Sequence, residues 1–179
     1  YLPDWHPWED YRTFYVSRRE TGACREIVPF ELSWLTWIFG GVKSVAALKA
    51  KTSDLDADID DVYQLIFTLE QGGLGHLVVD VVARDPIRRC LVIGTEGTVS
   101  WDWADHEVRL FVAGRGWTSY PEDQETVEPG YVNAEEPYVR EMAEFLRAAV
   151  GVTTWPYTLV DDLETLAILS AAERSAETR

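Results

Sequence analysis

Residues 60–83, DDVYQLIFTLEQGGLGHLVVDVVA, decide how the middle of this 179-residue chain is expected to fold. Two runs rich in valine, leucine and aromatic residues flank the tripeptide QGG at 71–73. A short glycine-containing connection between two such runs is typical of a β-hairpin. Because the two strands of a hairpin run in opposite directions, this stretch predicts an antiparallel sheet.

Further strand-like runs lie on both sides of the hairpin. Most of them are short, rich in β-branched or aromatic residues, and followed by a turn that contains glycine. Together with the hairpin they make roughly seven strands, mostly joined as consecutive hairpins, so the sheet is expected to be mainly antiparallel. Along the chain these runs cover residues 42–51, 88–94, 98–103, 107–114 and 116–121.

Helices are expected before and after the strands. Pro29 fits the first turn of a helix that ends at Phe39, where Gly40 and Gly41 stop it. Residues 135–151 form a second helix, and a third follows Thr158, which is a suitable N-cap. The apolar stripes of the three helices are Phe30, Trp34, Trp37 and Ile38; Tyr138, Met142, Phe145, Leu146 and Ala149; and Leu163, Leu166, Ala167 and Ser170.

This order predicts an α+β fold with an open, mostly antiparallel β-sheet. The helices would pack on one face of the sheet, and a second copy of the protein would cover the other face. Residues 1–179 are long enough for one domain with a sizeable core, and too short for two ordinary ones. In the opening segment, Pro3 and Pro7 indicate a loop, and the alternation from Tyr11 onward predicts a further strand.

Charge and composition exclude several classes of partner. The chain carries 31 acidic and 16 basic side chains, a formal net charge of −15, which disfavours nucleic acid and anionic membranes. No apolar run reaches the roughly 18 residues of a membrane span. The two cysteines, Cys24 and Cys90, do not suggest a disulfide framework, so a reduced, cytoplasmic setting is expected.

The sequence predicts neither a metal site nor a cofactor site within this chain. The three histidines, His6, His76 and His106, are not paired at ligand spacing. The acidic run at 54–61 resembles a calcium loop, but Ile59 and Leu65 replace its glycine and closing glutamate, so a solvated turn is expected. The glycines at 72–75 belong to a hairpin and not to a dinucleotide-binding turn.

The opening segment has the composition of a carbohydrate subsite. Sugar hydroxyls need paired donors and acceptors, and the faces of sugar rings stack on aromatic rings. Alternatively, the tryptophans only anchor a loop to the core, and the residues leave both interpretations open. His6 is the one side chain here that titrates near neutral pH, which suits a proton carrier. The polar residues are His6, Glu9, Asp10 and Arg12, placed among Trp5, Trp8 and Tyr11.

Five segments in the same order resemble the C-terminal domain of the Gfo/Idh/MocA oxidoreductases, the family of glucose–fructose oxidoreductase and inositol dehydrogenase. Each motif is weak alone, but their order along almost the whole chain is specific. They are LPDWHPWEDYR at 2–12, TGACREIVPFELSWLTWIFG at 21–40, IGTEGTVSWDW at 93–103, EPYVREMAEFLRAAVG at 136–151 and LAILSAAERSAETR at 166–179.

The resemblance implies a two-domain parent enzyme. An N-terminal Rossmann domain, absent from this chain, would bind NAD or NADP and supply the family's lysine. This domain would form the substrate side of the cleft for a small sugar or polyol, and its open sheet face would form a homo-oligomer. The parent is then an NAD(P)-dependent oxidoreductase, and this domain alone is expected to be inactive.

One departure from the family pattern concerns the first helix. Members usually carry there an Asp, then three residues, then a His that exchanges a proton with the substrate hydroxyl. Ile27 is aligned with that Asp and Phe30 with the His, and neither can move a proton. Ser33 replaces a further Asp. A non-catalytic sugar-binding or regulatory protein on the same fold is therefore the alternative, and a purely structural sheet that forms dimers is a third.

Replacement groups are available near these positions. Glu26 is the better substitute acid, although the helix dipole also favours an acid near a helix start for structural reasons. Arg18 or Arg19 matches an arginine often seen before the glycine turn, where it would hold a polar substrate. We expect His6 and Glu26 to be catalytic and the substrate to be bound by Trp5, Trp8, Glu9, Arg12, Arg18 and Phe30.

Overall fold

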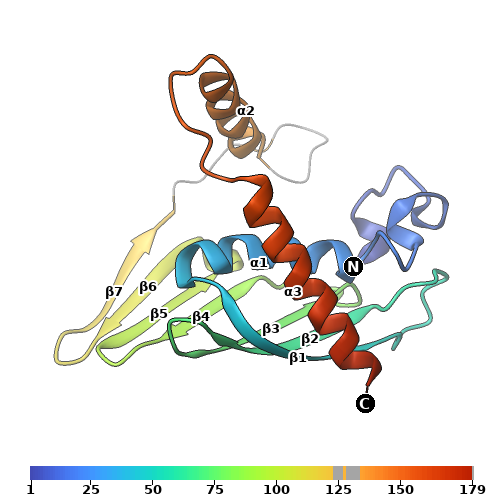
Figure 1. Ribbon diagram of the computed structural model, residues 1–179, viewed down its shortest axis with the longest axis horizontal. Coiled ribbons are helices and arrows are strands. Elements are labelled where there is room, and N and C mark those ends of the chain that lie inside the picture. Colours follow the sequence, from blue (N-terminus) through green and yellow to red (C-terminus); the bar gives the residue numbers. More distant parts are fainter. Residues whose placement is uncertain (123–126, 128–133, 179) are drawn as a thin grey trace. The chain divides into compact units, whose positions relative to one another are not determined.

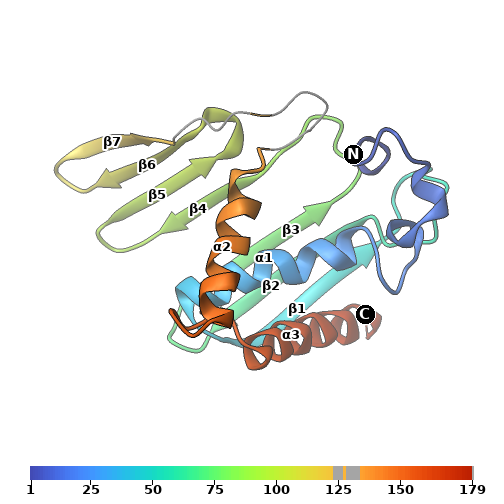
Figure 2. The same ribbon diagram turned by 90° about the horizontal axis from the view of Figure 1, so that it is seen from above.

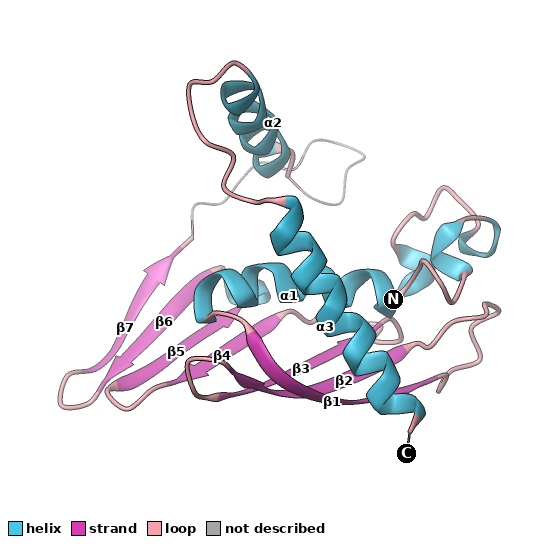
Figure 3. Cartoon of the chain, viewed as in Figure 1, coloured by secondary structure: helices cyan, strands magenta, loops and turns pink. Residues whose placement is uncertain are grey.

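Helices and strands are segregated along the chain, which confirms the α+β class (Figure 3). The computed structural model describes residues 1–122, 127 and 134–178. Helix α1 (Cys24–Phe39) precedes the strands, whereas α2 (Glu136–Ala149) and α3 (Leu159–Glu177) follow them. The chain divides into two compact units, one formed by Tyr1–Arg84 with Tyr157–Arg179 and the other by Asp85–Pro156.

The first unit contains a three-stranded antiparallel sheet. Strands β1 (Val42–Ala50), β2 (Val62–Leu69) and β3 (Leu74–Asp80) lie in that order. The predicted hairpin connects β2 to β3, and its turn holds Gly72 and Gly73 at φ of +92° and +111°. Residues with a Cβ rarely adopt such angles, so glycine is needed at both positions.

Helices α1 and α3 cover one face of this sheet (Figure 1; Figure 2). Helix α3 packs on β1, while α1 packs on β2 and β3. Strand β2 alternates strictly, because Tyr63, Leu65 and Phe67 are buried while the residues between them are exposed. They meet Leu32 of α1 and Leu169 of α3 in one apolar core. The prediction of helices packed on a single face is therefore confirmed for this unit.

The second unit contains a four-stranded antiparallel sheet and α2. Its strands are β4 (Arg89–Ile93), β5 (Gly97–Asp102), β6 (Glu107–Val112) and β7 (Gly116–Pro121), arranged in sequence order. All seven predicted strands are therefore present, but they form two hydrogen-bonded sheets instead of the single sheet expected.

The break between the sheets follows β3. The carboxylate of Asp80 accepts the backbone N–H groups of Val82 and Ala83 at 3.0 and 2.8 Å. These bonds turn the chain where the strand would otherwise continue, and Pro86 in the connection has no backbone N–H to donate to a ladder. The sheet consequently ends there, and a new one begins at Arg89.

Helix α1 begins five residues earlier than expected. It starts at Cys24, so Pro29 lies inside the helix and not in its first turn. The proline lacks the N–H that would donate to the carbonyl of Arg25. The loss of this hydrogen bond normally destabilises a helix. Burial outweighs that loss, because Cys24, Val28 and Leu32 all lie on the core face.

The strand predicted from Tyr11 onward is wrong. The segment forms short 3-10 turns at Leu2–Asp4, Tyr11–Thr13 and Tyr15–Ser17. Polar side chains bond to the nearby backbone and so compete with strand formation. Asp10 accepts the N–H of Arg12 at 3.1 Å, and the hydroxyl of Ser17 donates to the carbonyl of Phe14 at 2.9 Å.

The acidic run at 54–61 is not simply a solvated turn. Asp61 is fully buried and its carboxylate accepts four hydrogen bonds, from the N–H and hydroxyl of both Thr52 and Ser53, at 2.5–2.9 Å. Burial raises its pKa, but these bonds outweigh burial and hold the pKa below its ordinary value. Asp60 is ion-paired with Arg19 at 2.5 Å and with Lys49 at 3.1 Å.

The start of α3 was predicted correctly, but its buried face was not. Thr158 forms a capping box with Asp161, whose carboxylate accepts the Thr158 N–H at 2.6 Å. The helix carries apolar residues on both sides, so periodicity alone did not identify the inner face. Thr165, Ile168, Leu169 and Ala172 are buried, whereas Leu163 and Leu166 are exposed.

The expected stripe of α2 is present but not buried. Tyr138, Met142, Phe145 and Leu146 are each more than half exposed. Phe145 meets Trp155 edge-on at 5.8 Å.

Candidate functional site

One face of α1 carries the residues expected to form the site. Glu26, Phe30 and Ser33 are spaced four and three residues apart, so they lie on the same side of the helix. This corrects one alignment: three residues separate the family's Asp from its His, and counting back from Phe30 reaches Glu26. Ile27 instead packs against the core. Of these two neighbouring residues, Glu26 therefore shares the side of Phe30, whereas Ile27 faces the core.

A hollow of about 260 Å³ lies beside Phe30. Pro29, Phe30 and Ser33 of α1 line one part of it, and Tyr157 and Asp162 line the rest. Phe30 is 58% exposed. The Ser33 hydroxyl donates to the Phe30 carbonyl at 2.8 Å, and the Tyr157 hydroxyl donates to Oδ1 of Asp162 at 3.4 Å. The hollow thus combines aromatic rings, hydroxyls and one carboxylate.

Glu26 is held by a tyrosine. The hydroxyl of Tyr15 donates to Oε1 of Glu26 at 2.8 Å. This hydrogen bond, followed by burial, raises the pKa of Tyr15, so the phenol remains a neutral donor at neutral pH. The second carboxylate oxygen, Oε2, is buried and has no hydrogen-bond partner among the described residues. Such an orphaned acceptor is unusual in a folded protein and is compatible with a functional role.

His6 lies in an aromatic cluster. Its ring is nearly parallel to those of Trp8 and Phe14, with both centroids 5.4 Å away, and its Nδ1 lies 3.5 Å from Glu9. Phe14 in turn meets Tyr15 edge-on at 5.8 Å. Since Tyr15 bonds to Glu26, the two predicted catalytic residues are connected by a continuous series of side-chain contacts.

The tryptophans of the opening segment differ in environment. Trp5 packs against the hydrophobic core, as expected of a residue that anchors a loop. Trp8 stacks on His6 with one face and is 65% exposed, so its other face is open to a ligand. Both interpretations of this segment therefore find support, each from a different tryptophan.

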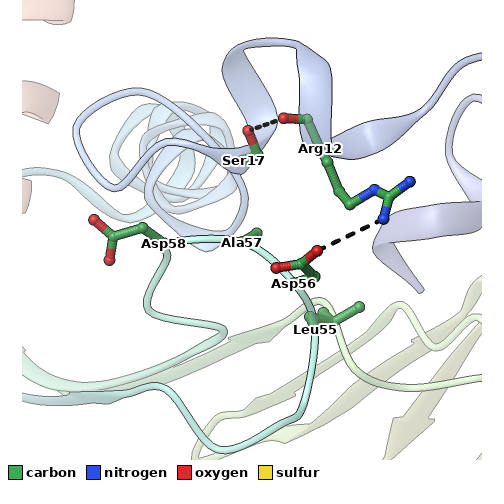
Figure 4. A pocket seen from close by; sticks show the side chains of 6 residues that line it. All are labelled: Arg12, Ser17, Leu55, Asp56, Ala57 and Asp58. Atoms are coloured by element: carbon green, nitrogen blue, oxygen red, sulfur yellow. Dashed lines mark hydrogen bonds and ion pairs between the residues drawn. The ribbon is translucent and has the colours of Figure 1, made fainter.

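Arg12 faces a separate hollow of about 510 Å³ (Figure 4). Its guanidinium holds both carboxylate oxygens of Asp10 and lies 3.6 Å from Asp56. The hydrogen bond from Arg12 lowers the pKa of Asp10 to about 2. The Arg12 guanidinium is thus already paired with two acids, and it lines a different hollow from Phe30. The lining residues are Arg12, Ser17, Leu55, Asp56, Ala57 and Asp58.

The two arginines before the glycine turn have different roles. Arg19 pairs with Asp58 at 2.8 Å and with Asp60 at 2.5 Å, so it fastens the opening segment to the loop before β2. Arg18 is exposed, and its backbone forms an isolated bridge with Asp58. Glu9 is also largely exposed, next to His6. The predicted site residues therefore form separate groups around His6, Arg12 and Phe30.

Three further polar residues belong to these groups. Tyr15 was assigned to a strand, so its approach to Glu26 was not anticipated. Tyr157 precedes α3 and Asp162 lies in its first turn, both more than 120 residues beyond Phe30 in the sequence. No local spacing links residues so far apart, so only the packing of α3 beside α1 brings them to Phe30.

Metal-ligating side chains are scattered over the described residues. No group of three or more metal-ligating side chains is found in the described part of the chain. The two sheets are antiparallel, so these residues present no βαβ unit of the kind that binds a dinucleotide. No helix in the described ranges is long and apolar enough to span a membrane.

These features define an α+β fold whose first helix places an aromatic ring and a hydroxyl beside a small hollow, with an acid one turn before the ring on the same side of the helix. A profile described as the GFO/IDH/MocA C-terminal domain matches residues 1–100, more than half of the chain. The chain therefore belongs to the GFO/IDH/MocA C-terminal domain family, as its motifs indicated. No curated protein matches the chain at a significant level.

Solved structures share the fold at low sequence identity. Levoglucosan dehydrogenase, in complex with NADH and levoglucosan, matches 98% of this chain and 54% of its own, with 16% identity and a TM-score of 0.78. UDP-N-acetylglucosamine 3-dehydrogenase GnnA from Acidithiobacillus ferrooxidans matches 85% and 46%, with 17% identity and a TM-score of 0.70. An oxidoreductase domain protein from Kribbella flavida matches 88% and 48%, with 17% identity and a TM-score of 0.73. The chain spans about half the length of these proteins.

Proposed function

We propose that this chain is the substrate-binding domain of an NAD(P)-dependent oxidoreductase that transfers a hydride at a hydroxyl or carbonyl carbon of a sugar or polyol. The proposal rests on family membership. The residues that match the family include the whole of α1, the helix that carries the candidate site. The structural neighbours include levoglucosan dehydrogenase in complex with NADH, with levoglucosan and with L-sorbose. Their names support a sugar as the substrate class.

The nicotinamide would be bound outside this chain. The described residues do not fit a dinucleotide, since their sheets are antiparallel and the glycines at 72–73 lie in a hairpin turn. We therefore assign NAD or NADP to a Rossmann domain elsewhere in the parent protein, and expect the domain described here to be inactive by itself.

The role of this chain is then to bind and orient the substrate. The exposed ring of Phe30 provides a stacking surface, and the oxygens of Ser33, Tyr157 and Asp162 lie beside it. Holding a reacting carbon in position lowers a barrier by several kcal/mol, up to about 7–11 kcal/mol for ideal alignment. Positioning requires no proton transfer. This chain can therefore still provide it, although Phe30 stands in place of the family's histidine.

Proton transfer requires a different side chain. Glu26 lies on the same face of α1 as Phe30, and Tyr15 fixes one of its oxygens. His6 is the alternative carrier, oriented by Trp8 and Glu9. We propose Glu26 and His6 as the proton-transferring groups of this chain, with Tyr15 as a positioning residue for Glu26.

The outer face of the β1–β3 sheet is proposed as an oligomer interface. Leu48, Ile66 and Val78 lie on the three strands, and each is about half exposed. A sheet face with several exposed aliphatic residues is typical of a surface that another protein covers. A second copy of this chain is the simplest occupant, since homo-oligomers with two-fold symmetry are common.

A reducing, cytoplasmic setting is proposed from the cysteines. Cys24 is a buried free thiol. Burial, the largest influence, raises the pKa of Cys24, so this thiol is protonated and unreactive at neutral pH.

The proposal is tested on the full-length parent protein. NAD⁺ or NADP⁺ is offered together with neutral sugars and polyols, and reduction of the nicotinamide is followed by absorbance. We expect turnover with at least one such substrate, and a substantial loss of kcat on replacing Glu26 by Gln. A parent that neither binds NAD(P)H nor alters its absorbance with any sugar would contradict the proposed activity.

A non-catalytic sugar-binding or regulatory protein is the second candidate. It is favoured by Phe30, which stands where the family has its proton-transferring histidine. Two variants of the parent separate the candidates, Phe30→His and His6→Ala. Loss of turnover on the His6 change alone supports an enzyme with a relocated proton carrier. Sugar binding without turnover in wild type, together with activity gained in Phe30→His, supports the binding protein.

A further inference from the structure

Arg19 connects the opening segment to the loop before β2 through two carboxylates. Its Nη1 donates to Oδ1 of Asp60 at 2.5 Å, and its Nη2 and Nε donate to Oδ1 of Asp58 at 2.8 and 3.1 Å. The two acids differ in environment, because the Asp58 side chain is 79% exposed and that of Asp60 only 10%. Water and salt therefore weaken the contact with Asp60 less than the contact with Asp58.

Asp60 is held in place from the sheet as well. Lys49 of β1 donates to its second oxygen, Oδ2, at 3.1 Å. The next residue, Asp61, is fully buried and accepts the four hydrogen bonds described above. Burial raises the pKa of Asp60, but the hydrogen bonds from Arg19 and Lys49 outweigh burial and hold the pKa below its ordinary value. Asp60 is thus a charged, fixed anchor at neutral pH.

The turn that carries Arg19 is bonded directly to the backbone of Tyr15. The carbonyl of Tyr15 accepts the N–H of Arg18 at 3.1 Å and the hydroxyl of Thr21 at 3.0 Å. Within the turn, the N–H of Gly22 donates to the Arg18 carbonyl at 2.9 Å. Because these bonds make the turn a compact unit, a displacement of Arg19 would also displace Tyr15.

The side chain of Tyr15 depends on this backbone for its direction. Tyr15 is 46% exposed, so packing does not enclose its ring, although the next residue, Val16, is buried. Its hydroxyl nevertheless donates to Oε1 of Glu26 at 2.8 Å. A series of contacts thus connects the loop before β2 with the acid proposed to transfer a proton; its members are Asp60, Arg19, Tyr15 and Glu26.

Two roles for Arg19 can be distinguished by kinetics. The family resemblance would give an arginine before the glycine turn a polar substrate to hold. In this structure its guanidinium is already paired with two acids, and other residues line the hollows beside Arg12 and Phe30. Loss of a residue that only binds substrate raises KM, whereas loss of a residue that acts on the transition state lowers kcat.

We propose that Arg19 is a positioning residue: its ion pair with Asp60 holds Tyr15 at the place where the tyrosine hydroxyl orients Glu26 for proton transfer. Arg19 itself touches neither the substrate nor the cofactor. This inference rests on the proposed function, to which it adds the residues that orient the acid.

Steady-state kinetics of the full-length parent provide the first test. In Arg19→Ala, Asp60 keeps Lys49 as its partner, so no buried charge is left alone and the fold should persist. We expect kcat to fall about 10- to 100-fold, since a misplacement of about 1 Å can cost 100-fold, while KM changes less than about threefold. Arg19→Lys restores a charge opposite Asp60 and should recover part of kcat. Arg140→Ala removes an ion-paired arginine from α2 and should leave kcat unchanged.

The ionisation of Tyr15 provides a second test that needs no substrate. The hydrogen bond to Glu26, followed by burial, raises the pKa of Tyr15. NMR of the parent with isotope-labelled tyrosine follows the titration, and the signal lost in Tyr15→Phe identifies this residue. In Arg19→Ala the titration should move down toward the ordinary tyrosine value of about 10, because the phenol is no longer held against the carboxylate. Arg140→Ala should not move it.

The outcomes separate this inference from the proposed function. A higher KM with unchanged kcat in Arg19→Ala would make Arg19 a substrate-binding residue and overturn the inference. An unchanged Tyr15 titration in that variant also overturns it, and so does loss of the fold in circular dichroism, which indicates a general structural role. If the wild-type parent turns over no sugar or polyol, the proposed function fails and positioning for catalysis fails with it. The Tyr15 titration then still decides whether Arg19 holds Tyr15 in place.

Discussion

Replacing Asp61 by Asn should destabilise the protein strongly. The buried carboxylate accepts two backbone N–H groups and two hydroxyls, from Thr52 and Ser53, at 2.5–2.9 Å. Each oxygen receives one of the two N–H groups. An asparagine amide has only one oxygen, so in either orientation its NH₂ group faces a backbone N–H that can only donate.

The magnitude follows from these contacts. Hydrogen bonds to a charged group are worth about 1.5–3 kcal/mol and neutral ones about 0.5–1.5 kcal/mol. Losing one charge-assisted bond and weakening the others should cost about 2–4 kcal/mol. For a chain of this length that corresponds to a fall in melting temperature of roughly 4–16 °C. Asp54→Asn, an exposed acid in the same run, should change stability by less than about 0.5 kcal/mol.

The pH dependence provides a second readout. The pKa of Asp61 is lowered in the folded state, so its contribution to stability is present above the unfolded value of about 3.9 and is lost as pH falls through the folded pKa. The free-energy difference between wild type and Asp61→Asn should therefore be constant near neutral pH and shrink below about pH 4.

Urea unfolding measured at several pH values provides the assay. A loss below about 1 kcal/mol at pH 7 would refute the reasoning, because the four hydrogen bonds would then contribute little. A difference between Asp61→Asn and wild type that grows as the pH falls would refute the sign of the pKa argument. Asp54→Asn controls for the loss of one negative charge from this acidic run.

Three other changes have definite expected results. Gly22→Ala should prevent normal packing, because its Cβ would lie 2.3 Å from the Cα of Val16; low soluble yield or a large fall in melting temperature would be observed, and near wild-type stability would contradict the close approach. Thr158→Ala should cost about 1 kcal/mol in urea unfolding by removing the hydroxyl that caps α3 through Asp161, and no measurable loss would count against the cap. Ile66→Lys should leave the fold intact but reduce the oligomeric state in sedimentation, whereas an unchanged sedimentation coefficient would argue against the sheet-face interface.

Local signals predicted the regular elements well. The β2–β3 hairpin, the remaining strands and the Thr158 cap all follow from turn residues and alternation over fewer than about ten residues. The division into two sheets was not predicted, because it depends on how Asp80 and the residues after it bend the chain. The opening segment was assigned to a strand because its aromatic residues alternate, whereas side-chain bonds from Asp10 and Ser17 to nearby backbone favour turns.

The candidate site was predicted only where one helix carries it. Phe30 and Glu26 were identified from the first helix and its resemblance to the family. Tyr157 and Asp162 could not be found from spacing, since they reach Phe30 only after α3 has packed beside α1. The buried face of α3 was misjudged for a related reason: both sides are apolar, and only the tertiary contacts select Leu169 for the core.

Leu2 determines where this protein can be shortened or fused to another. Its side chain is 1% exposed within the core, and its N–H donates to the carbonyl of Val81 at 3.0 Å. A shortened version that starts after Leu2 would lose this apolar contact and leave the Val81 carbonyl without that donor, so it should be less soluble. Expression vectors for this domain should therefore retain Leu2, with any affinity tag attached through a linker ahead of it.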